Sequence, residues 1–268
     1  MRDLEIRSPL GRVQLTAVRA GTNRLPVLNI ALFGGTFDPI HAGHLRAVRT
    51  AARRFKLDRV LFIPSGVPPH KPGEELSPFA HRFAMVALAV RGERRFIPSL
   101  LEAPRLDGRP NYAVETAQAV RGMLGPRDQL YFILGIDSFL DLPNWKDYRR
   151  LSALADFIVA SRPGFGSRQL LARIGNGYAG TVLAKNGRTL MLPGGAGVHV
   201  LSGVRAPIAS RDIRGAAAAG RSLAGLVPPL VEEYIVKEAL YGARGGEADD
   251  RTSRRSGPGR ARSQGASA

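Results

Sequence analysis

The sequence predicts an α/β protein with a doubly wound, mostly parallel sheet and a helical C-terminal segment. Short apolar runs recur along the chain, and stretches with helical periodicity separate them. Because a helix between two parallel strands returns the chain in a right-handed crossover, this order covers both faces of a sheet. The first apolar run leads into Gly34 and Gly35, the pattern of a buried strand entering a tight turn. Ligands gather at the carboxyl ends of the strands in such sheets, so we expect a site at this turn.

The individual elements follow from local patterns taken in chain order. Strands are predicted where glycine or proline closes an apolar run, and helices where apolar residues recur every three or four positions. Between residues 164 and 197 the pattern loosens into glycine-rich segments, for which loops and weak strands are predicted. The predicted strands span residues 29–33, 59–63, 130–134, 156–160 and 198–201, and the predicted helices span residues 43–55, 79–90, 112–123, 210–219 and 228–241.

The two ends of the chain are predicted to lie outside the folded domain. Residues 1–27 show no clear periodicity and are interpreted as an N-terminal extension. Residues 28–242 are assigned to the domain. Residues 243–268 are glycine, serine, arginine and aspartate with little to bury, so a disordered basic tail is predicted there.

Composition excludes several classes of protein. The 268 residues include no cysteine, which rules out disulfide frameworks and cysteine nucleophiles and suits a reducing cytoplasm. No apolar stretch approaches the roughly 20 residues of a membrane helix, and the N-terminus lacks the order of a signal peptide. The net charge of +17 attracts polyanions, but its arginines are scattered singly or lie in the tail, without interleaved aromatic residues. We therefore expect a cytoplasmic protein with neither a membrane nor a specific nucleic-acid partner.

The strongest functional signal is the segment GGTFDPIHAGH at residues 34–44. A glycine turn lets a triphosphate approach the backbone, and the amides and dipole at the start of the next helix favour an anion. His41 and His44 are three apart, so both imidazoles should lie on one face of the first turn. There they could hold phosphate oxygens and stabilise a pentavalent phosphorus centre. The alternative is a pair of ordinary surface histidines in a capped turn.

A second phosphate-binding candidate lies near the end of the domain. Ser210 is a natural N-cap for the helix that follows it, and Arg214 comes four residues later. Hydroxyl, open amides and guanidinium could therefore converge on one phosphate. Helix capping alone explains the serine equally well.

Taken together with further segments, the pattern resembles bacterial nicotinate-nucleotide adenylyltransferases, which belong to the nucleotidyltransferase superfamily related to class I aminoacyl-tRNA synthetases. The resemblance covers about residues 30–241. It implies a Rossmann-like nucleotidyltransferase fold and the transfer of the adenylyl group of ATP to nicotinate mononucleotide, a step of NAD biosynthesis. The segments that carry it are HAGH at 41–44, HK at 70–71, HR at 81–82, NYAVET at 111–116, GIDSF at 135–139, LPNWK at 142–146 and SRPGF at 161–165.

The resemblance also implies roles for individual residues. Asp137 would lie by the nucleotide sugar, Trp145 would stack on the pyridine ring, Tyr112 would belong to the loop around the pyridine carboxylate, and Lys71 would face substrate phosphate. Mg²⁺ is expected on the ATP phosphates, since no cluster of carboxylates suggests a dedicated metal cage. The implied catalytic residues are His41, His44 and Arg214; the ATP-binding residues are Gly34, Gly35, Thr36, Phe37, Gly43, Asp137 and Ser210; and the substrate-binding residues are Lys71, Tyr112 and Trp145.

Three of these roles have structural alternatives. Trp145 could anchor the core, Asp137 could cap the helix after Gly135, and Tyr112 could pack against the sheet. Two rival functions also stay open: a sister transferase that uses nicotinamide mononucleotide or pantetheine phosphate, and a basic nucleic-acid-binding module. The sequence leaves the oligomeric state open.

The sequence departs from the family pattern at two places. The usual S-S-T-x-I-R is changed at Ala209 and Arg211, which leaves Ser210 and Arg214 in place. Ala113 stands where the family more often has threonine, so backbone amides would have to hold the pyridine carboxylate there.

Overall fold

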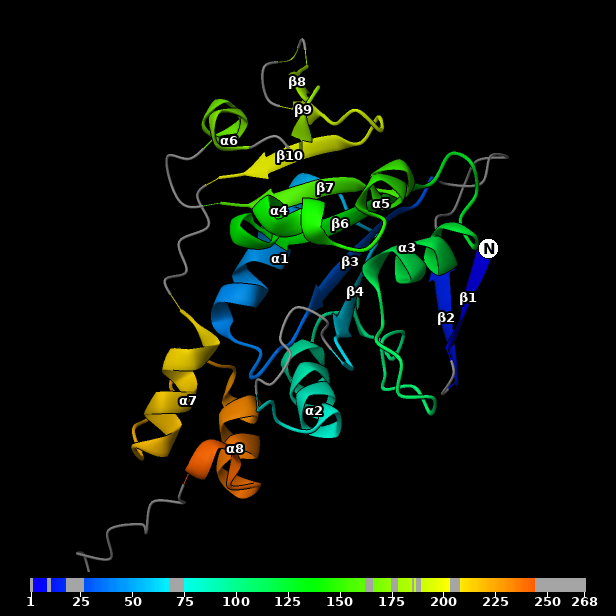
Figure 1. Cartoon of the computed structure of the whole chain (residues 1–268). Helices are drawn as coiled ribbons and strands as arrows, with labels where there is room; N and C mark the ends of the chain where they lie inside the picture. Colours follow the sequence, from blue (N-terminus) through cyan, green and yellow to red (C-terminus); the bar gives the residue numbers. More distant parts are fainter. Residues whose placement is uncertain are drawn as a thin grey trace, which may run out of the picture.

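The computed structural model describes residues 2–8, 11–17, 27–67, 75–161, 166–174, 178–184, 186, 189–202 and 208–243. Within them, an eight-stranded sheet lies between two layers of helices (Figure 1). Its strands are β3 (Asn29–Gly35), β4 (Arg59–Pro64), β5 (Phe96–Pro98), β6 (Gln129–Gly135), β7 (Asp156–Ala160), β8 (Val182–Leu183), β9 (Thr189–Met191) and β10 (Gly197–Leu201).

The order of the strands confirms the doubly wound sheet. It runs β5-β4-β3-β6-β7-β10-β9-β8, and every neighbouring pair from β5 to β10 is parallel. β9 and β8 continue the sheet in antiparallel pairing. The chain builds outward from β3 in one direction and from β6 in the other, so the order reverses between these two strands. A ligand site is expected at their carboxyl ends.

Both faces of the sheet are buried, which explains why the strands read as continuous apolar runs. In β3, Ile30 and Leu32 pack into one apolar core, and Ala31 and Phe33 pack into the other. The four side chains are at most 7% exposed. A half-buried strand would instead have alternated apolar and polar residues.

Helices from both halves of the chain cover these two faces. The core around Ala31 includes side chains of α1 (Ala42–Arg54), α2 (Phe79–Val90), α7 (Ser210–Ala218) and α8 (Pro229–Lys237). The core around Ile30 includes side chains of α3 (Ala113–Arg121), α4 (Ile136–Asp141), α5 (Tyr148–Leu154) and α6 (Ser167–Arg173). α7 and α8 lie together at one end of the molecule and form the predicted helical C-terminal segment (Figure 1).

Every predicted strand and helix is present, and α2 has both of its predicted ends. The sequence patterns missed β5, α4, α5 and the 3₁₀ turn η1 (Leu142–Asn144). β5 is shorter than the apolar run that marks a strand, and the other three are shorter than the window in which helical periodicity can be recognised. α6 lies in the segment predicted to hold only loops and weak strands. The helix predicted for residues 228–241 ends at Lys237, and a 3₁₀ turn, η3 (Leu240–Gly242), follows it.

The predicted lack of periodicity in residues 1–27 is wrong, because part of this segment forms two strands. β1 (Arg2–Ser8) and β2 (Gly11–Ala17) form an antiparallel pair whose register pairs Leu4 with Leu15 and Ile6 with Val13. The alternation of these apolar residues with polar ones has the period of two that a strand requires. The predicted domain boundaries stay predictions, and the predicted tail from residue 244 onward lies outside the described residues. None of the described helices is long and apolar enough to cross a membrane.

Candidate active site

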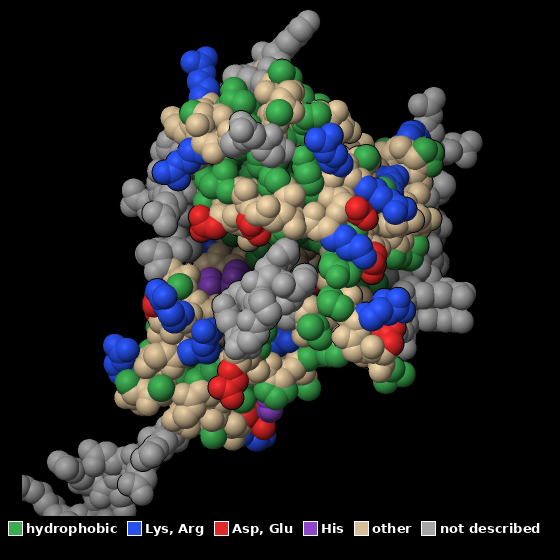
Figure 2. All heavy atoms as spheres, viewed as in Figure 1, with side chains coloured by type: hydrophobic (Ala, Val, Ile, Leu, Met, Phe, Trp, Pro, Cys, Tyr) green, Lys and Arg blue, Asp and Glu red, His purple; other side chains and the backbone are tan. Residues whose placement is uncertain are grey.

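A cavity of about 910 Å³ opens at the carboxyl ends of β3 and β6, where the strand order reverses. Its volume suits a ligand larger than a single small metabolite. In the space-filling view, histidine side chains lie within a hollow on this face of the molecule (Figure 2). The predicted site residues that line the cavity are Gly34, Gly35, Thr36, Phe37, His41, Gly43, His44, Tyr112, Asp137, Trp145 and Ser210.

His41 and His44 form a stacked pair at the start of α1. Their ring centroids are 3.6 Å apart and their planes differ by 17°. The backbone N–H of each residue donates to Nδ1 of the other, at 3.2 Å from His41 and 3.3 Å from His44. His41 is thus the N-cap of α1, and the two residues form a reciprocal capping box. His41 is 6% exposed and is therefore not a surface histidine, whereas the phosphate-binding role of the pair stays a prediction.

This geometry fixes the protonation of both rings. Burial lowers the pKa of His41 to about 4, and burial together with His41 lowers the pKa of His44 well below its usual value. Both imidazoles are therefore neutral near pH 7. Because Nδ1 accepts a hydrogen bond in each ring, the proton resides on Nε2. Each ring can then offer an Nε2–H donor in the cavity wall.

The turn before the histidines is shaped by Phe37. This residue has a φ of 49°, in the left-handed region that a bulky side chain rarely adopts. Its ring is 2% exposed and meets His44 edge-on at 5.3 Å. A Cβ on Gly35 would lie 3.3 Å from the Phe37 ring, so glycine at that position lets the ring fold back under the turn.

Arg82 holds the backbone around this turn. It is 2% exposed, and its guanidinium donates to four carbonyl oxygens in the two connections that follow β3 and β4. The accepting groups are Thr36 at 2.8 Å, Ser65 at 2.7 Å, Gly66 at 3.3 Å and Ser77 at 2.9 Å. Burial lowers the pKa of Arg82, and the nearby Asp38 partly opposes that shift. Arg82 therefore ties the ends of β3 and β4 to the start of α2.

Asp38 joins the same turn to the C-terminal segment. Its side chain is 1% exposed; Oδ1 accepts from the hydroxyl of Tyr241 at 2.6 Å and Oδ2 from the backbone N–H of Ser77 at 3.1 Å. Burial, followed by the hydrogen bond to Asp38, raises the pKa of Tyr241, which keeps the phenol protonated as a donor. Asp38 thus connects the turn both to Ser77, before α2, and to Tyr241 in the C-terminal segment.

Ser210 and Arg214 of α7 donate hydrogen bonds to the turn, and their predicted contact with phosphate stays a prediction. The N-cap of α7 is Ala209, so the expectation that Ser210 caps this helix is wrong. The Ser210 hydroxyl donates instead to the carbonyl of Pro39 at 3.0 Å, because this acceptor lies within reach from a distant part of the chain. Arg214 donates to the carbonyl of Asp38 at 2.7 Å and is not among the residues that line the cavity.

Part of the cavity wall is aromatic. Trp145 follows η1, lines the cavity and meets Phe132 of β6 edge-on, with ring centroids 6.1 Å apart. Tyr112 is the N-cap of α3, and no side chain caps the first turn of that helix. Both side chains also pack against the apolar core. The alternative roles, a core anchor for Trp145 and packing against the sheet for Tyr112, therefore describe part of what these residues do. Asp137 lies in the first turn of α4, whose N-cap Gly135 receives no side-chain bond, so Asp137 does not cap the helix.

Comparison with known proteins decides which family this site belongs to. Residues 32–216 match the Cytidylyltransferase-like family. The chain is 40% identical over 217 residues to the "Probable nicotinate-nucleotide adenylyltransferase" of Geobacter sulfurreducens, a match that covers 80% of this chain and 98% of the relative. It is 41% identical over 215 residues to the protein of the same name from Pelobacter propionicus, with the same coverage of both chains. The chain belongs to the nicotinate-nucleotide adenylyltransferase family.

The fold of this family is also found among solved structures. The Plasmodium falciparum nicotinic acid mononucleotide adenylyltransferase complexed with NaAD superposes with a TM-score of 0.61 at 17% sequence identity. The superposition covers 81% of this chain and 98% of the other. The family resemblance and the Rossmann-like nucleotidyltransferase fold predicted from the motifs are thereby confirmed.

The adenylyltransferase cavity contains one buried carboxyl group that sequence reasoning missed. Glu102 is 8% exposed, lines the cavity and accepts a 2.9 Å hydrogen bond from the hydroxyl of Thr116. Burial raises the pKa of Glu102 to about 7, while the bond from Thr116 opposes that shift. Nearby on the cavity wall, the buried Oδ1 of Asn111 has no hydrogen-bond partner among the described residues. No sequence pattern marks Glu102, because it follows β5, which is itself too short to recognise.

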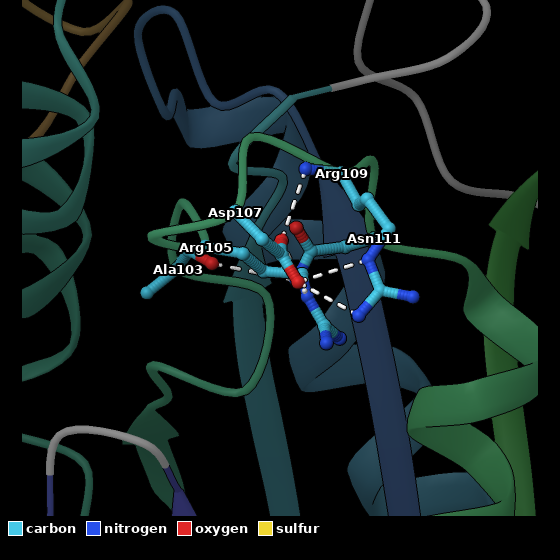
Figure 3. A network of polar contacts seen from close by, with 5 residues as sticks. All are labelled: Ala103, Arg105, Asp107, Arg109 and Asn111. Carbon is cyan, nitrogen blue, oxygen red and sulfur yellow. Dashed lines mark hydrogen bonds and ion pairs between the residues drawn. The ribbon is translucent and has the colours of Figure 1, made fainter.

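The loop from β5 to α3 leads from Glu102 to the aromatic wall. Asp107 accepts from Arg105 Nε at 3.2 Å and from Arg109 Nε at 2.9 Å, and Asn111 donates to the carbonyl of Ala103 at 3.4 Å (Figure 3). Hydrogen bonds from Arg109, and then from Arg105, lower the pKa of Asp107 to about 2. Both arginines are therefore engaged outside the cavity and are absent from its lining.

Two further predictions concern Lys71 and a bound metal ion. Lys71 lies outside the described residues, so its predicted contact with substrate phosphate stays a prediction. In the described part of the chain, no group of three or more His, Cys, Asp and Glu side chains is arranged to hold a metal ion.

Arg82 could have been recognised from sequence as a basic residue on the face of a helix that it shares with Met85 and Val86.

Proposed function

We propose that this chain transfers the adenylyl group of ATP to nicotinate mononucleotide in the cytoplasm, giving nicotinate adenine dinucleotide and pyrophosphate in NAD biosynthesis. Family membership supports the reaction class and the acceptor. The observation that carries the proposal is the stacked pair of neutral imidazoles at the start of α1, beside a glycine turn and a cavity of nucleotide size.

ATP would place its triphosphate along the turn from Gly34 to Phe37 and across the start of α1. Backbone amides and the positive end of the helix dipole favour an anion there. His41 and His44 would donate their Nε2–H groups to phosphate oxygens, and the strength of these bonds would grow as charge develops in the transition state. Asp137, in the first turn of α4, would lie by the nucleotide sugar.

The reaction requires no covalent intermediate on the protein. An oxygen of the 5′-phosphate of nicotinate mononucleotide attacks the α-phosphorus of ATP in line with the bond to the β-phosphate bridging oxygen. That bond breaks as the new P–O bond forms, and pyrophosphate leaves with the electron pair. The protein contributes by positioning the two phosphates and by stabilising charge on the equatorial oxygens.

Arg214 and Ser210 would support this step from outside the phosphate site. Their hydrogen bonds to the carbonyls of Asp38 and Pro39 hold the turn that presents the histidines. In this arrangement Arg214 acts by positioning, and a direct contact with phosphate would require its guanidinium to swing toward the cavity. Ser210 already lines the cavity and could contact phosphate without such a movement.

A divalent cation, which we propose to be Mg²⁺, would arrive on the ATP phosphates. The described residues provide no cluster of three or more metal-ligating side chains, so the donor set fits a cation coordinated mainly by phosphate oxygens and water. When bound, it would neutralise part of the triphosphate charge. Asp137 and Asp141 are the carboxylates of α4 that line the cavity and could assist through water.

The acceptor would bind at the aromatic wall. Trp145 offers a flat face for the electron-poor pyridine ring, and Tyr112 stands at the start of α3 beside it. Because Ala113 has no hydroxyl, side-chain recognition of the pyridine carboxylate at this helix has to come from another residue.

The test is to measure pyrophosphate release from ATP with each acceptor in turn. We expect the highest kcat/KM with nicotinate mononucleotide, lower values with nicotinamide mononucleotide and none with pantetheine phosphate. Replacing both histidines by alanine should abolish release while the circular dichroism spectrum is retained. Pyrophosphate release that is unaffected by the double replacement, or the absence of release with any pyridine mononucleotide, would refute the proposed function.

The net charge of +17 is the one observation that favours a second function, nucleic-acid binding. Deleting residues 244–268 and measuring DNA and RNA binding at several salt concentrations separates the two functions. An enzyme without a nucleic-acid partner should bind weakly and lose that binding with the deleted segment. Tight binding that survives the deletion would favour the second function.

A further inference from the structure

The acceptor end of the cavity contains a single cationic side chain among the described residues that line it. Lys146 directly follows Trp145, and its companions in the lining include no other lysine or arginine. The ionisable groups that share the described lining are the two neutral histidines and the carboxyl groups of Glu102, Asp137 and Asp141. The carboxylate of an acid acceptor therefore has one described partner of opposite charge.

The Lys146 ammonium group makes two contacts, and its side chain is 45% exposed. Nζ lies 3.9 Å from the centroid of the Tyr112 ring, which is within the range of a cation–π interaction. It also lies 3.2 Å from Oε1 of Glu115, in the first turn of α3. An ammonium group has three N–H donors, so these contacts leave donor capacity for a ligand. The cation is thereby held beside the aromatic wall on which the pyridine ring would stack.

From this geometry we infer that Lys146 is a specificity-determining residue, which selects an acceptor bearing a carboxylate over the corresponding amide. The inference rests on the proposed function and deepens it, since it names the group that recognises the acid. The pyridine carboxylate would add to the ion pair of Lys146 or replace Glu115 in it. A carboxamide carries no net charge and gains nothing comparable from a nearby ammonium group.

The carboxyl groups of the cavity do not cancel this preference. Glu115 is exposed and paired with Lys146. Glu102 is buried with a pKa of about 7, so near neutral pH a large share of it is uncharged. On the neighbouring loop, Asp107 forms ion pairs with Arg105 and Arg109. Asp137 and Asp141 lie on α4, and Asp141 accepts a 2.8 Å hydrogen bond from the side-chain amide of Asn144.

The experiment compares acid and amide acceptors in matched variants at saturating ATP. Lys146→Gln removes the charge, Lys146→Arg keeps it, and Glu115→Gln removes its ion-pair partner while leaving the cation. For each, KM and kcat are measured with nicotinate mononucleotide and with nicotinamide mononucleotide. Where the amide turns over too slowly, its inhibition constant against the acid takes the place of KM.

Lys146→Gln should raise the KM for the acid about tenfold or more and change the value for the amide by less than about twofold. Lys146→Arg should restore the wild-type preference, and Glu115→Gln should leave the KM for the acid unchanged or lower it. The KM for ATP should stay the same throughout, which a general loss of structure would not allow.

An equal rise for acid and amide in Lys146→Gln, or an unchanged ratio between them, would overturn the inference. Failure of the proposed function gives a different result, because the wild-type protein would then release no pyrophosphate with either mononucleotide. In that event, calorimetric binding of the two mononucleotides to the wild type and to Lys146→Gln still decides whether Lys146 distinguishes them.

Discussion

The hydroxyl of Tyr241 donates a 2.6 Å hydrogen bond to Asp38, across a sequence separation of 203 residues. It joins the turn after α8 to the turn that presents the histidine pair. The backbone around the bond has unusual dihedral angles, since Tyr241 has a φ of 61°. The end of the domain therefore helps to hold the turn at the phosphate site. A substitution that breaks this hydrogen bond should lower the catalytic rate.

We expect Tyr241→Phe to lower both stability and activity. The substitution leaves the buried Oδ1 of Asp38 without its donor, which costs about 1–3 kcal/mol in the free energy of unfolding. Because the turn loosens, kcat/KM for ATP should fall as well. The matched control is Tyr234→Phe, since the Tyr234 hydroxyl on α8 pairs with His81 at 2.9 Å and does not reach the turn. Equal effects of the two variants on ATP kinetics would contradict the positioning role.

Arg82→Lys should be more damaging than its conservative character suggests. A guanidinium can reach four carbonyl groups in different directions, whereas an ammonium group on a different stem cannot match that geometry. Buried carbonyl groups lose their donors, so we expect the free energy of unfolding to fall by about 3 kcal/mol in chemical denaturation.

Arg49→Lys provides the control for Arg82→Lys. Arg49 pairs with Glu93 at 2.9 Å, and its side chain is 49% exposed. A surface ion pair contributes about 0–1 kcal/mol, so this replacement should cost little. If Arg82→Lys were as mild as Arg49→Lys, Arg82 would not be holding the loops around the site.

His44→Ala should lower kcat by about 100-fold to 1,000-fold while the fold is retained. The variant loses one Nε2–H donor and also the acceptor for the backbone N–H of His41. His81→Ala is a suitable control, because His81 pairs with Tyr234 on the far side of α2. Near-normal turnover in folded His44→Ala would remove this residue from the mechanism.

The two histidines should remain neutral in mildly acidic solution. Since the pKa of His41 is about 4 and that of His44 is also lowered, the folded state resists protonation that the unfolded chain accepts near pH 6.5. Their contribution to stability is present above pH 6.5 and is lost as the pH falls toward 4. Long-range ¹H–¹⁵N spectra at pH 6 should show both rings with the proton on Nε2. A doubly protonated ring at that pH would contradict this arrangement.

The parts of the fold and site that could be predicted from sequence depend on short-range pattern. β3 is an apolar run closed by Gly34, and His41 and His44 are three positions apart on one helix, so both could be recognised within a few residues. The doubly wound, mostly parallel sheet followed from the alternation of such runs with helices. α4 escaped prediction because its six residues are too few to show a helical period.

The supports of the site could not be predicted, because they depend on tertiary contacts. Nothing near Ser210 in sequence indicates that its hydroxyl binds Pro39, 171 positions away, in place of capping α7. The pairing of Asp38 with Tyr241 is equally remote. A sequence pattern can place a residue type on an element, but the partner that it meets depends on how distant elements pack.

Glu102→Gln should change the pH dependence of stability. The pKa of Glu102 is raised from its ordinary 4.5 to about 7, so the folded state disfavours the charged form. Wild-type protein therefore loses stability from this group as the pH rises from 4.5 to 7, by a total on the order of 3 kcal/mol. Glutamine keeps an oxygen that can accept from Thr116 but cannot ionise, so the variant should gain stability relative to wild type over that interval.

Urea denaturation of both proteins at pH 5, 6, 7 and 8 measures this difference. Glu115→Gln is the control, because its side chain is 49% exposed and its removal should cost no more than about 1 kcal/mol at any of these pH values. If the free-energy profiles of wild type and Glu102→Gln run parallel between pH 5 and 8, Glu102 does not titrate in this range. A difference that widens with pH would instead show that a carboxyl group in the wall of the cavity is kept neutral by its surroundings.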